Sequence, residues 1–434
     1  MKKLFIDTLG CQMNKSDTER IIGMLSHFDY SVTDDEKDAD LYIVNTCAIR
    51  QLSADKAYSR LGAWGKIKAE QKKRGRDVKI AIAGCVAQLE KESLLKKFPY
   101  LDLVFGSQYL YELPNLLKEI EEKRVCATDN FSPAEKEYNI SRVKSVNAWL
   151  PVMEGCNNFC SYCVVPYTRG RERSRSVEAI ISEAKKVIKE GFKEITLLGQ
   201  NVDSYGKTLE NKPTFAYLLQ ELDKLEGNFR IRFTTSYPTD ITDEVIETVK
   251  NSSKICECFH IPMQSGNDRV LHEMNRRYNV EEYSSIVKKI RENIKDVTIT
   301  SDFIAGFPGE TEEEFYDTIR AIDKLELDYS NTAAYSPRPN TKAGKMTDKF
   351  IPEDVKKQRL QILNDKVKEM SLKSNQKYVG RTMEVLIDDA KEGIYQGRTR
   401  NNKVVHVKGE FKIGDFVEVE ITKASTWCLF GNKK

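Results

Sequence analysis

The sequence predicts an α/β protein of three parts: an N-terminal parallel-sheet α/β domain, a central partial (βα)6 barrel and a small C-terminal β-barrel of the OB kind. Short apolar runs alternate with amphipathic stretches over most of the chain, and this pattern is typical of βα units. Beyond Gly380 the apolar residues recur with a period of two. At 434 residues the chain is too long for one ordinary core. We therefore place domains at 1–126, 147–376 and 377–434, with a polar, ordered linker at 127–146.

The composition excludes several classes of protein. Apolar residues make up 40% and charged residues 31% of the chain, as in soluble globular proteins, and no apolar run approaches the ~18 residues of a membrane span. The first residues enter a strand pattern directly, so we expect no signal peptide, no membrane contact and a cytoplasmic location. In that compartment ten cysteines favour metal or catalytic roles over disulfides. Because the net charge is only +3, nucleic-acid binding would depend on local basic patches.

Three expected strands of the N-terminal domain are each followed by a cysteine: Cys11, Cys47 and Cys85. The ligand crevice of a parallel sheet lies outside the carboxyl ends of its strands, so these thiols can converge on one site. Gly10 and Gly84 would let the backbone turn sharply beside a bulky cofactor. The alternative is that each cysteine is a small buried apolar residue. The repeated placement favours a three-thiolate site. The expected strands lie at 4–9, 41–46, 78–83 and 101–105.

The central part contains a compact cysteine motif, Cys156-Asn-Asn-Phe-Cys160-Ser-Tyr-Cys163. A structural zinc site is normally closed by four protein ligands, and an electron-transfer iron–sulfur cluster normally takes four cysteines. Three thiolates therefore leave one metal position open, which indicates chemistry rather than structure alone. The alternative is a zinc loop whose fourth ligand lies elsewhere in the chain.

Six βα units around this loop predict a barrel or an open barrel, with a helix at 177–190 that is capped by Ser176. In such folds the functional residues lie in the loops that follow the strands. These loops are rich in Gly, Gln, Ser and Asp, and together they could hold a polar nucleoside cofactor, although each one alone could be an ordinary turn. The expected strands lie at 149–153, 194–198, 230–235, 258–261, 298–305 and 331–335.

Two groups of basic residues are candidate RNA contacts. Arg169 and Arg171 belong to a run of alternating arginines after the cysteine motif, where a phosphate contact and a solvated loop that pairs with a cofactor carboxylate are both open. The C-terminal barrel, expected to follow a helix that begins at Pro352, supplies the second group. Such barrels bind nucleic acids or serve as lids. The second group is Arg398, Arg400 and Lys403.

The stretch 154–172 resembles the radical S-adenosylmethionine (SAM) loop of the methylthiotransferases. The strand-end cysteines resemble the N-terminal domain of that family, and the C-terminal part resembles its TRAM module. Within the family, Gly10-Cys11-Gln12-Met13-Asn14 and Asn45-Thr46-Cys47-Ala48-Ile49-Arg50 are similar to the MiaB-type tRNA enzymes. Ala48-Ile49 departs from the more usual Ser-Val, which affects no catalytic position.

The resemblance implies two 4Fe–4S clusters. Cys156, Cys160 and Cys163 would bind the cluster whose fourth iron is chelated by SAM. The strand-end cysteines would bind an auxiliary cluster that carries the sulfur to be transferred. No side chain is expected to act as a catalytic acid or base, because the cofactors perform the difficult step. By loop position, the SAM contacts would be Gln200, Ser236 and Gln264.

The implied reaction is methylthiolation at C2 of N6-(dimethylallyl)adenosine at position 37, in the anticodon loop of tRNA. The implied partners are this tRNA, an electron donor such as flavodoxin or ferredoxin, and a sulfur donor, and we expect a monomer. Two alternatives stay open at this point. One is a sister enzyme that acts on threonylcarbamoyladenosine in tRNA or on a ribosomal-protein aspartate. The other is an iron–sulfur RNA-binding or electron-transfer protein without turnover.

Overall fold

A computed structural model describes residues 1–48, 51–129, 140–143 and 145–434. Ile49 and Arg50 of the second cysteine motif, and most of the expected linker at 127–146, lie outside the described residues. Within the described ranges, no helix is both long enough and apolar enough to cross a bilayer. The chain divides into two compact units. The first comprises Met1–Lys144, Glu154–Asn157 and Cys163–Glu172, and the second comprises Ser145–Met153, Asn158–Tyr162 and Arg173–Lys434.

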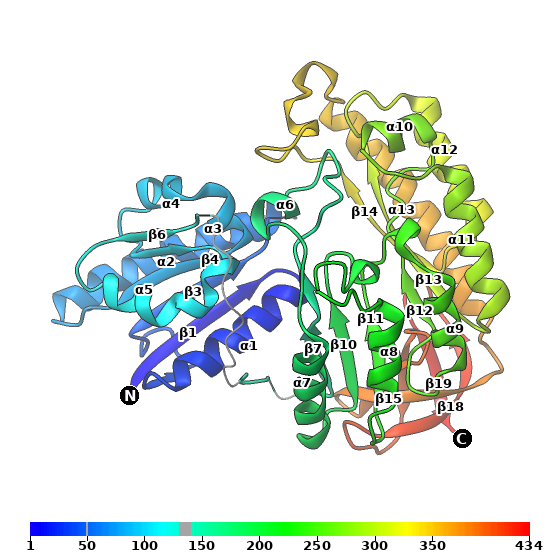
Figure 1. The fold of residues 1–434 in the computed structure, drawn as a ribbon, viewed down its shortest axis with the longest axis horizontal. Coiled ribbons are helices and arrows are strands. Elements are labelled where there is room, and N and C mark those ends of the chain that lie inside the picture. The colour runs from blue at the N-terminus through cyan, green and yellow to red at the C-terminus, as the bar shows by residue number, and fades with distance from the viewer. Residues whose placement is uncertain (49–50, 130–139, 144) are drawn as a thin grey trace. The chain divides into compact units, whose positions relative to one another are not determined.

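The first unit contains a parallel sheet of six strands in the order β2-β1-β3-β4-β5-β6, blue to cyan in Figure 1. The four strands expected from the sequence are present, and the parallel α/β sheet is confirmed. The sequence missed β2 and β6, which are three-residue strands at the two edges. The strands are β1 (Lys2–Leu9), β2 (Tyr30–Val32), β3 (Leu41–Thr46), β4 (Lys79–Gly84), β5 (Leu103–Phe105) and β6 (Val125–Ala127).

Helices cover both faces of this sheet. Leu41 and Ile43 of β3 pack in one apolar cluster with α1 and α5, whereas Tyr42 and Val44 pack in a second cluster with α2, α3 and α4. This alternation follows from the two-residue period of a strand. With both faces buried, the carboxyl edge of the sheet is the place for a site. The helices are α1 (Gln12–Ser26), α2 (Gln51–Lys73), α3 (Cys85–Glu90), α4 (Glu92–Lys97), α5 (Leu113–Glu119) and α6 (Val165–Thr168).

The second unit begins with two parallel three-stranded sheets, in the orders β11-β10-β7 and β12-β13-β14. A parallel bridge between Ile231 and Ile255 connects β11 to the segment before β12. The expected partial barrel is therefore confirmed. Its strands are β7 (Asn147–Pro151), β10 (Glu194–Leu198), β11 (Arg230–Phe233), β12 (Cys258–His260), β13 (Thr298–Ala305) and β14 (Tyr329–Ala334), and the short strands β8 (Met153–Glu154) and β9 (Arg173–Ser174) flank the cysteine motif.

Amphipathic helices surround these strands. The expected cap of α7 is present, because the Ala179 N–H donates to Ser176 Oγ over 3.2 Å. In α13, Leu363 and Met370 are buried in the same apolar core as the strands. The helices are α7 (Val177–Lys189), α8 (Phe215–Asp223), α9 (Asp243–Asn251), α10 (Asp268–Glu273), α11 (Val280–Asn293), α12 (Glu312–Leu325) and α13 (Glu353–Gln376).

The C-terminal part is a closed barrel in the order β15-β16-β17-β19-β18, as expected. Val385, Ile387, Val405 and Val407 are among the residues that fill its interior, and their spacing is the two-residue period of the sequence. The strands are β15 (Thr382–Lys391), β16 (Ile394–Thr399), β17 (Val404–Lys408), β18 (Phe416–Ala424) and β19 (Leu429–Lys433).

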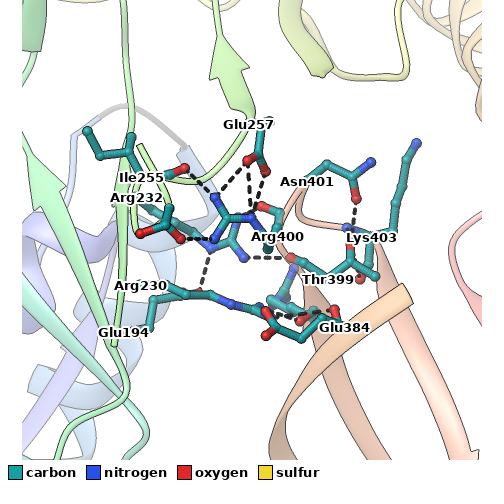
Figure 2. A network of polar contacts seen from close by, with 12 residues as sticks. Glu194, Arg230, Arg232, Ile255, Glu257, Glu384, Thr399, Arg400, Asn401 and Lys403 are labelled. Carbon is teal, nitrogen blue, oxygen red and sulfur yellow. Dashed lines mark hydrogen bonds and ion pairs between the residues drawn. The ribbon is translucent and has the colours of Figure 1, made fainter. Parts of the chain in front are cut away.

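Arginines join this small barrel to the amino-terminal ends of β10, β11 and β12 (Figure 2). Arg232 pairs with Glu194 at 2.7 Å and donates to the carbonyls of Thr399 and Arg400, both at 2.7 Å. Arg400 in turn pairs with Glu257, with 2.6 Å between Nη2 and Oε1. The contact therefore lies at the opposite end of these strands from the loops in which function is expected.

Replacing Arg232 with methionine is expected to lower the free energy of unfolding of the second unit by about 3 kcal/mol, because Glu194 would stay buried without its partner. Chemical denaturation followed by tryptophan fluorescence measures the change. The matched control is Arg320→Met, which removes an exposed ion pair and should cost under about 1 kcal/mol. Equal losses in the two variants would contradict the structural role of Arg232.

Candidate functional site

The three strand-end cysteines come together in the first unit. Strands β1, β3 and β4 are neighbours, and Leu9 pairs with Thr46, which pairs with Gly84. Cys11, Cys47 and Cys85 follow these three residues within two positions, so their thiols meet at the carboxyl edge of the sheet. Cys47 makes side-chain hydrogen bonds with both other cysteines. The expected convergence is therefore confirmed, while the metal that the thiols would bind stays a prediction.

The contacts among the three thiols lower the pKa of two of them and raise the pKa of the third. A hydrogen bond from Cys47 is the main cause that lowers the pKa of Cys11 to about 6 and that of Cys85 to about 5. The same two bonds raise the pKa of Cys47. The group thus behaves as two thiolates that share one proton, and thiolates are the form that binds iron.

The donor set of this site is three free thiols, and an iron–sulfur cluster takes such donors. All ten cysteines are described, and none of them forms a disulfide. Among the described residues, no three His, Cys, Asp or Glu side chains are arranged to hold a single metal ion. An iron–sulfur cluster does not require the three thiols to surround one ion, because each cysteine bonds to a separate iron.

Two glycines make room for the thiols. A Cβ on Gly10 would lie 2.3 Å from Asn14 Oδ1 and 3.0 Å from the Cβ of Cys47. Gly84 has a φ of +87°, and a Cβ there would lie 2.6 Å from the carbonyl oxygen of Thr46. Both positions therefore require glycine, as the sequence indicated.

A pair of buried asparagines fixes the cysteine backbone. Asn14 Nδ2 donates to Asn45 Oδ1 over 3.0 Å, and Asn45 Nδ2 donates to the Asn14 carbonyl over 2.9 Å. Asn14 Oδ1 also accepts from the N–H of Cys11 over 3.3 Å. The sequence motifs contained both asparagines, but nothing in the sequence showed that they bind each other.

Arg169 lies beside the same cysteines and not on the surface. Only 2% of it is exposed, and it pairs with Asp17 through contacts of 2.5 and 3.3 Å and with Glu154 at 3.6 Å. Arg169 and Thr168 also make side-chain hydrogen bonds with Cys85. Burial raises the pKa of Asp17 to about 6 although Arg169 opposes this. The arginine thus directs hydrogen-bond donors at the cysteines, while Asp17 balances much of its charge.

Two cysteines of the compact motif lie in the first unit. The Cys156 N–H donates to the Gly170 carbonyl over 3.2 Å, and Cys163 Sγ accepts from the Val165 N–H over 3.5 Å. Gly155, at φ +80°, has no room for a Cβ, which would lie 2.1 Å from the Arg171 carbonyl oxygen. Tight backbone contacts therefore fix the two ends of the cysteine loop.

The middle of the motif belongs to the second unit and is held by the segment after α10. The Ser161 N–H donates to the Met274 carbonyl over 2.9 Å, and Asn275 Nδ2 donates to the carbonyls of Asn158 and Phe159 over 3.1 and 3.0 Å. Arg276 reaches the thiol of the middle cysteine, Cys160, over 3.4 Å. The sequence gave no signal for these contacts.

The loops after β10 and β11 contain buried polar atoms without partners. Asn201 Oδ1, both carboxylate oxygens of Asp203 and Ser236 Oγ make no well-formed hydrogen bond, although Ser236 is near enough to Asp203 to lower its pKa slightly. Buried polar groups are normally hydrogen-bonded, so these atoms are candidates to bind a polar ligand. Gln200 lies in the same loop, and Gln264 follows β12 with a φ of +77°. Such a backbone for a non-glycine residue is typical of functional sites.

Burial raises the pKa of Asp203 to about 7, well above the ordinary value of 3.8 for an aspartate. Between these values the folded protein keeps a proton that the unfolded chain releases. The contribution of Asp203 to the free energy of unfolding should therefore fall by about 1.4 kcal/mol per pH unit as the pH rises from 5 to 6.5. Asp203→Asn should remove this slope, as urea denaturation of the metal-free protein at several pH values would measure. An identical slope in the variant would show that Asp203 is ionised when buried.

The structure separates the candidate RNA contacts into two groups. Arg171 is exposed, and Arg398 is partly exposed and lies 3.5 Å from Asp388. Arg169 and Arg400 are in ion pairs, and Lys403 is buried with Ser374 at 2.8 Å and Asp328 at 3.4 Å. These internal ion pairs explain the charges of Arg169, Arg400 and Lys403 without an RNA contact.

Family models match all three parts of the chain. The Radical SAM superfamily matches residues 150–322, the Uncharacterized protein family UPF0004 matches residues 3–106, and the TRAM domain matches residues 376–434. Among solved structures, the radical S-adenosylmethionine methyltransferase TsrM from Kitasatospora setae has a TM-score of 0.59 at 14% identity, over 79% of this chain and 75% of that one. This likeness concerns the fold alone.

Curated relatives match almost the whole chain. The tRNA-2-methylthio-N(6)-dimethylallyladenosine synthase of Acetivibrio thermocellus is 42% identical over 99% of this chain and 91% of its own length. The enzymes of the same name from Clostridium botulinum and Carboxydothermus hydrogenoformans are 43% and 42% identical, over 99% of this chain and 97% and 99% of theirs. The chain therefore belongs to the family of tRNA-2-methylthio-N(6)-dimethylallyladenosine synthases, which are radical SAM methylthiotransferases.

Proposed function

We propose that this protein methylthiolates C2 of N6-(dimethylallyl)adenosine at position 37 of tRNA. The observation that carries the proposal is the convergence of Cys11, Cys47 and Cys85 at the ends of three adjacent strands, in a chain that also has the radical SAM motif. One set of three thiolates would suffice for a radical SAM enzyme alone. A second set supports a reaction that must also deliver sulfur.

The radical SAM cluster is held by Cys156, Cys160 and Cys163 in this proposal. When bound, the cluster and SAM supply the one-electron chemistry that an unactivated aromatic C–H bond requires. The chain keeps the first and last cysteines of the motif in place through backbone contacts, and it holds the middle one from the segment after α10.

The auxiliary cluster is held by Cys11, Cys47 and Cys85. Three findings support a bulky anionic group at this position. They are the lowered pKa values of two thiols, the buried side chain of Arg169, and glycines at the two positions, Gly10 and Gly84, where a Cβ would collide with its neighbours. Three thiolates leave one iron of such a cluster open, and this iron would carry the sulfur.

The loops after β10, β11 and β12 would bind SAM. Gln200, Ser236 and Gln264 remain our candidates, and the unpartnered atoms of Asn201 and Asp203 extend the same polar surface. Hydrogen bonds from SAM would satisfy these atoms, which are costly to leave unpaired in the interior.

The tRNA would meet Arg171, which is exposed, and Arg398, which is partly exposed. Arg169, Arg400 and Lys403 pair with internal carboxylates, so they would contribute less to RNA binding. A flavodoxin or ferredoxin would supply electrons, and a separate donor would supply sulfur. We expect a monomer in the cytoplasm, where tRNA is modified.

Two measurements test the proposed function. Anaerobically reconstituted protein should contain about eight irons per chain, in two clusters of four. Nucleoside mass spectrometry of tRNA from a strain without the gene should find N6-(dimethylallyl)adenosine in place of its 2-methylthio derivative, and the gene should restore the derivative. Persistence of the methylthio nucleoside in that strain would refute the substrate.

A further inference from the structure

The segment Met274–Tyr278 holds the middle of the cysteine motif by side-chain and backbone contacts. Phe159 and Asn275 both have left-handed backbones, with φ of +48° and +57°. Asparagine adopts this conformation readily, but it is unfavourable for a bulky residue such as Phe159 and persists there only where surrounding contacts impose it. Here the Asn275 amide bonds to two carbonyls of the loop, and the Ser161 N–H bonds to Met274. The segment therefore fixes the orientation of Cys160.

Arg276 is held rigidly within this segment. Its Nε donates to Tyr278 Oη over 2.6 Å, and its Nη2 donates to the Pro262 carbonyl over 2.6 Å. The guanidinium carbon lies 4.5 and 4.9 Å from the ring centroids of Tyr237 and Tyr278. The remaining nitrogen, Nη1, contacts Cys160 Sγ at 3.4 Å. Its direction is therefore set by neighbours other than the cysteine.

The charge of Arg276 lacks a carboxylate partner in the part of the chain that the structure describes. Its hydrogen bonds go to a phenol, a carbonyl and a thiol. Among the described residues, the four arginines with less than a tenth of their surface exposed each pair with a carboxylate: Arg169 with Asp17, Arg230 with Glu384, Arg232 with Glu194 and Arg359 with Glu310. Arg276, which is partly buried, instead directs its charge at sulfur.

A cation beside Cys160 Sγ affects the electron affinity of the metal cluster that this cysteine would bind. Hydrogen bonds to cysteine sulfurs and the net charge around a cluster set its reduction potential. One-electron reduction takes a 4Fe–4S cluster from a core charge of +2 to +1, with the electron supplied by an external reductant and no bond broken. A fixed cation stabilises the product more than the reactant. No proton moves, because a guanidinium stays protonated in proteins.

We propose that Arg276 is a positioning residue that orients Cys160 and raises the reduction potential of the cluster bound by the compact cysteine motif. The inference rests on the proposed function, because it requires that Cys156, Cys160 and Cys163 bind a redox cluster. It adds a residue that neither the motif nor its spacing identifies.

The test uses the full chain with Cys11, Cys47 and Cys85 all replaced by alanine, so that one cluster gives the signal. In this background, Arg276→Gln, Arg276→Lys and the control Arg277→Gln are reconstituted anaerobically and titrated with dithionite, with the reduced cluster followed by electron paramagnetic resonance. Arg277 is exposed, and within the described ranges only its backbone N–H makes a hydrogen bond, to Tyr237 Oη, so its side chain is a matched control.

We expect Arg276→Gln to retain about four irons and to lower the equilibrium constant for reduction at least tenfold, which is 59 mV for one electron. Arg276→Lys keeps a charge but loses the fixed guanidinium hydrogen bond to Cys160 Sγ, so it should lower the potential by a smaller amount, and Arg277→Gln should not shift it. An unchanged potential in iron-loaded Arg276→Gln would overturn the proposal. If that variant fails to hold iron, Arg276→Lys decides: a lowered potential supports the proposal and an unchanged one overturns it. Absence of iron in the background protein itself would instead refute the proposed function.

Discussion

Replacing Cys47 with alanine is expected to abolish methylthiolation while SAM cleavage continues. Cys47 lies between Cys11 and Cys85 and makes hydrogen bonds to both, so its loss removes the central ligand of the auxiliary site. The compact motif is unchanged, and its cluster should still form. Iron should therefore fall from about eight to about four per chain. Mass spectrometry of the product nucleoside and chromatography of 5′-deoxyadenosine measure the two activities separately.

Cys126→Ala is the matched control for this variant. Cys126 lies in β6 of the same sheet and contacts Thr128 rather than the other cysteines. This control should keep about eight irons and full activity. Methylthiolation by iron-loaded Cys47→Ala would show that sulfur is transferred without the auxiliary site.

The convergence of the strand-end cysteines could be predicted from the sequence, because a cysteine after each of three parallel strands is an unusual repeat. A cysteine follows each of β1, β3 and β4 within two positions, and the sheet registers of Leu9, Thr46 and Gly84 bring the three cysteines close together. The central barrel and the C-terminal barrel could also be predicted. Short apolar runs alternate with amphipathic stretches in the first, whereas apolar residues recur with a period of two in the second. The edge strands β2 and β6 were missed because three residues give no measurable period.

The charged partners of the cysteines could not be predicted. Arg276 is 116 residues from Cys160 in the sequence, and Arg169 is 152 residues from Asp17. The chain contains 69 lysines and arginines, and no local pattern separates these two from solvated ones. The alternating arginines suggested an RNA contact for Arg169, and the small C-terminal barrel suggested one for Arg400. Both arginines instead pair with carboxylates, which bind a guanidinium much as phosphates do. Only the fold shows which of these anions is near.

Each cysteine site thus has one arginine, but the two arginines differ in charge balance. Arg169 is paired with Asp17, so the auxiliary site gains an oriented dipole and little net charge. Arg276 has no carboxylate among its described contacts and keeps its full charge beside Cys160. This difference fits the two proposed roles, because the radical SAM cluster must accept an electron and the auxiliary cluster must hold sulfur.

Replacing Arg169 with methionine is expected to lower the free energy of unfolding of the first unit by about 3–5 kcal/mol and to abolish methylthiolation. The stability loss arises because Asp17 would remain buried without its cation. The variant should be weakest at high pH. Its Asp17 would have a pKa raised further above the unfolded value, so stability would fall as pH rises until that pKa is passed. Chemical denaturation at pH 6 and pH 8 measures both effects.

A second variant separates stability from function at this site. Arg169→Met combined with Asp17→Leu leaves no lone buried charge, and such replacements of a buried ion pair are often neutral or stabilising. The double variant should regain most of the lost stability. It should not regain methylthiolation, because the contact between Arg169 and Cys85 would still be missing. Recovery of activity together with stability would mean that Arg169 serves the fold alone, and the auxiliary cluster would then need no cation beside it.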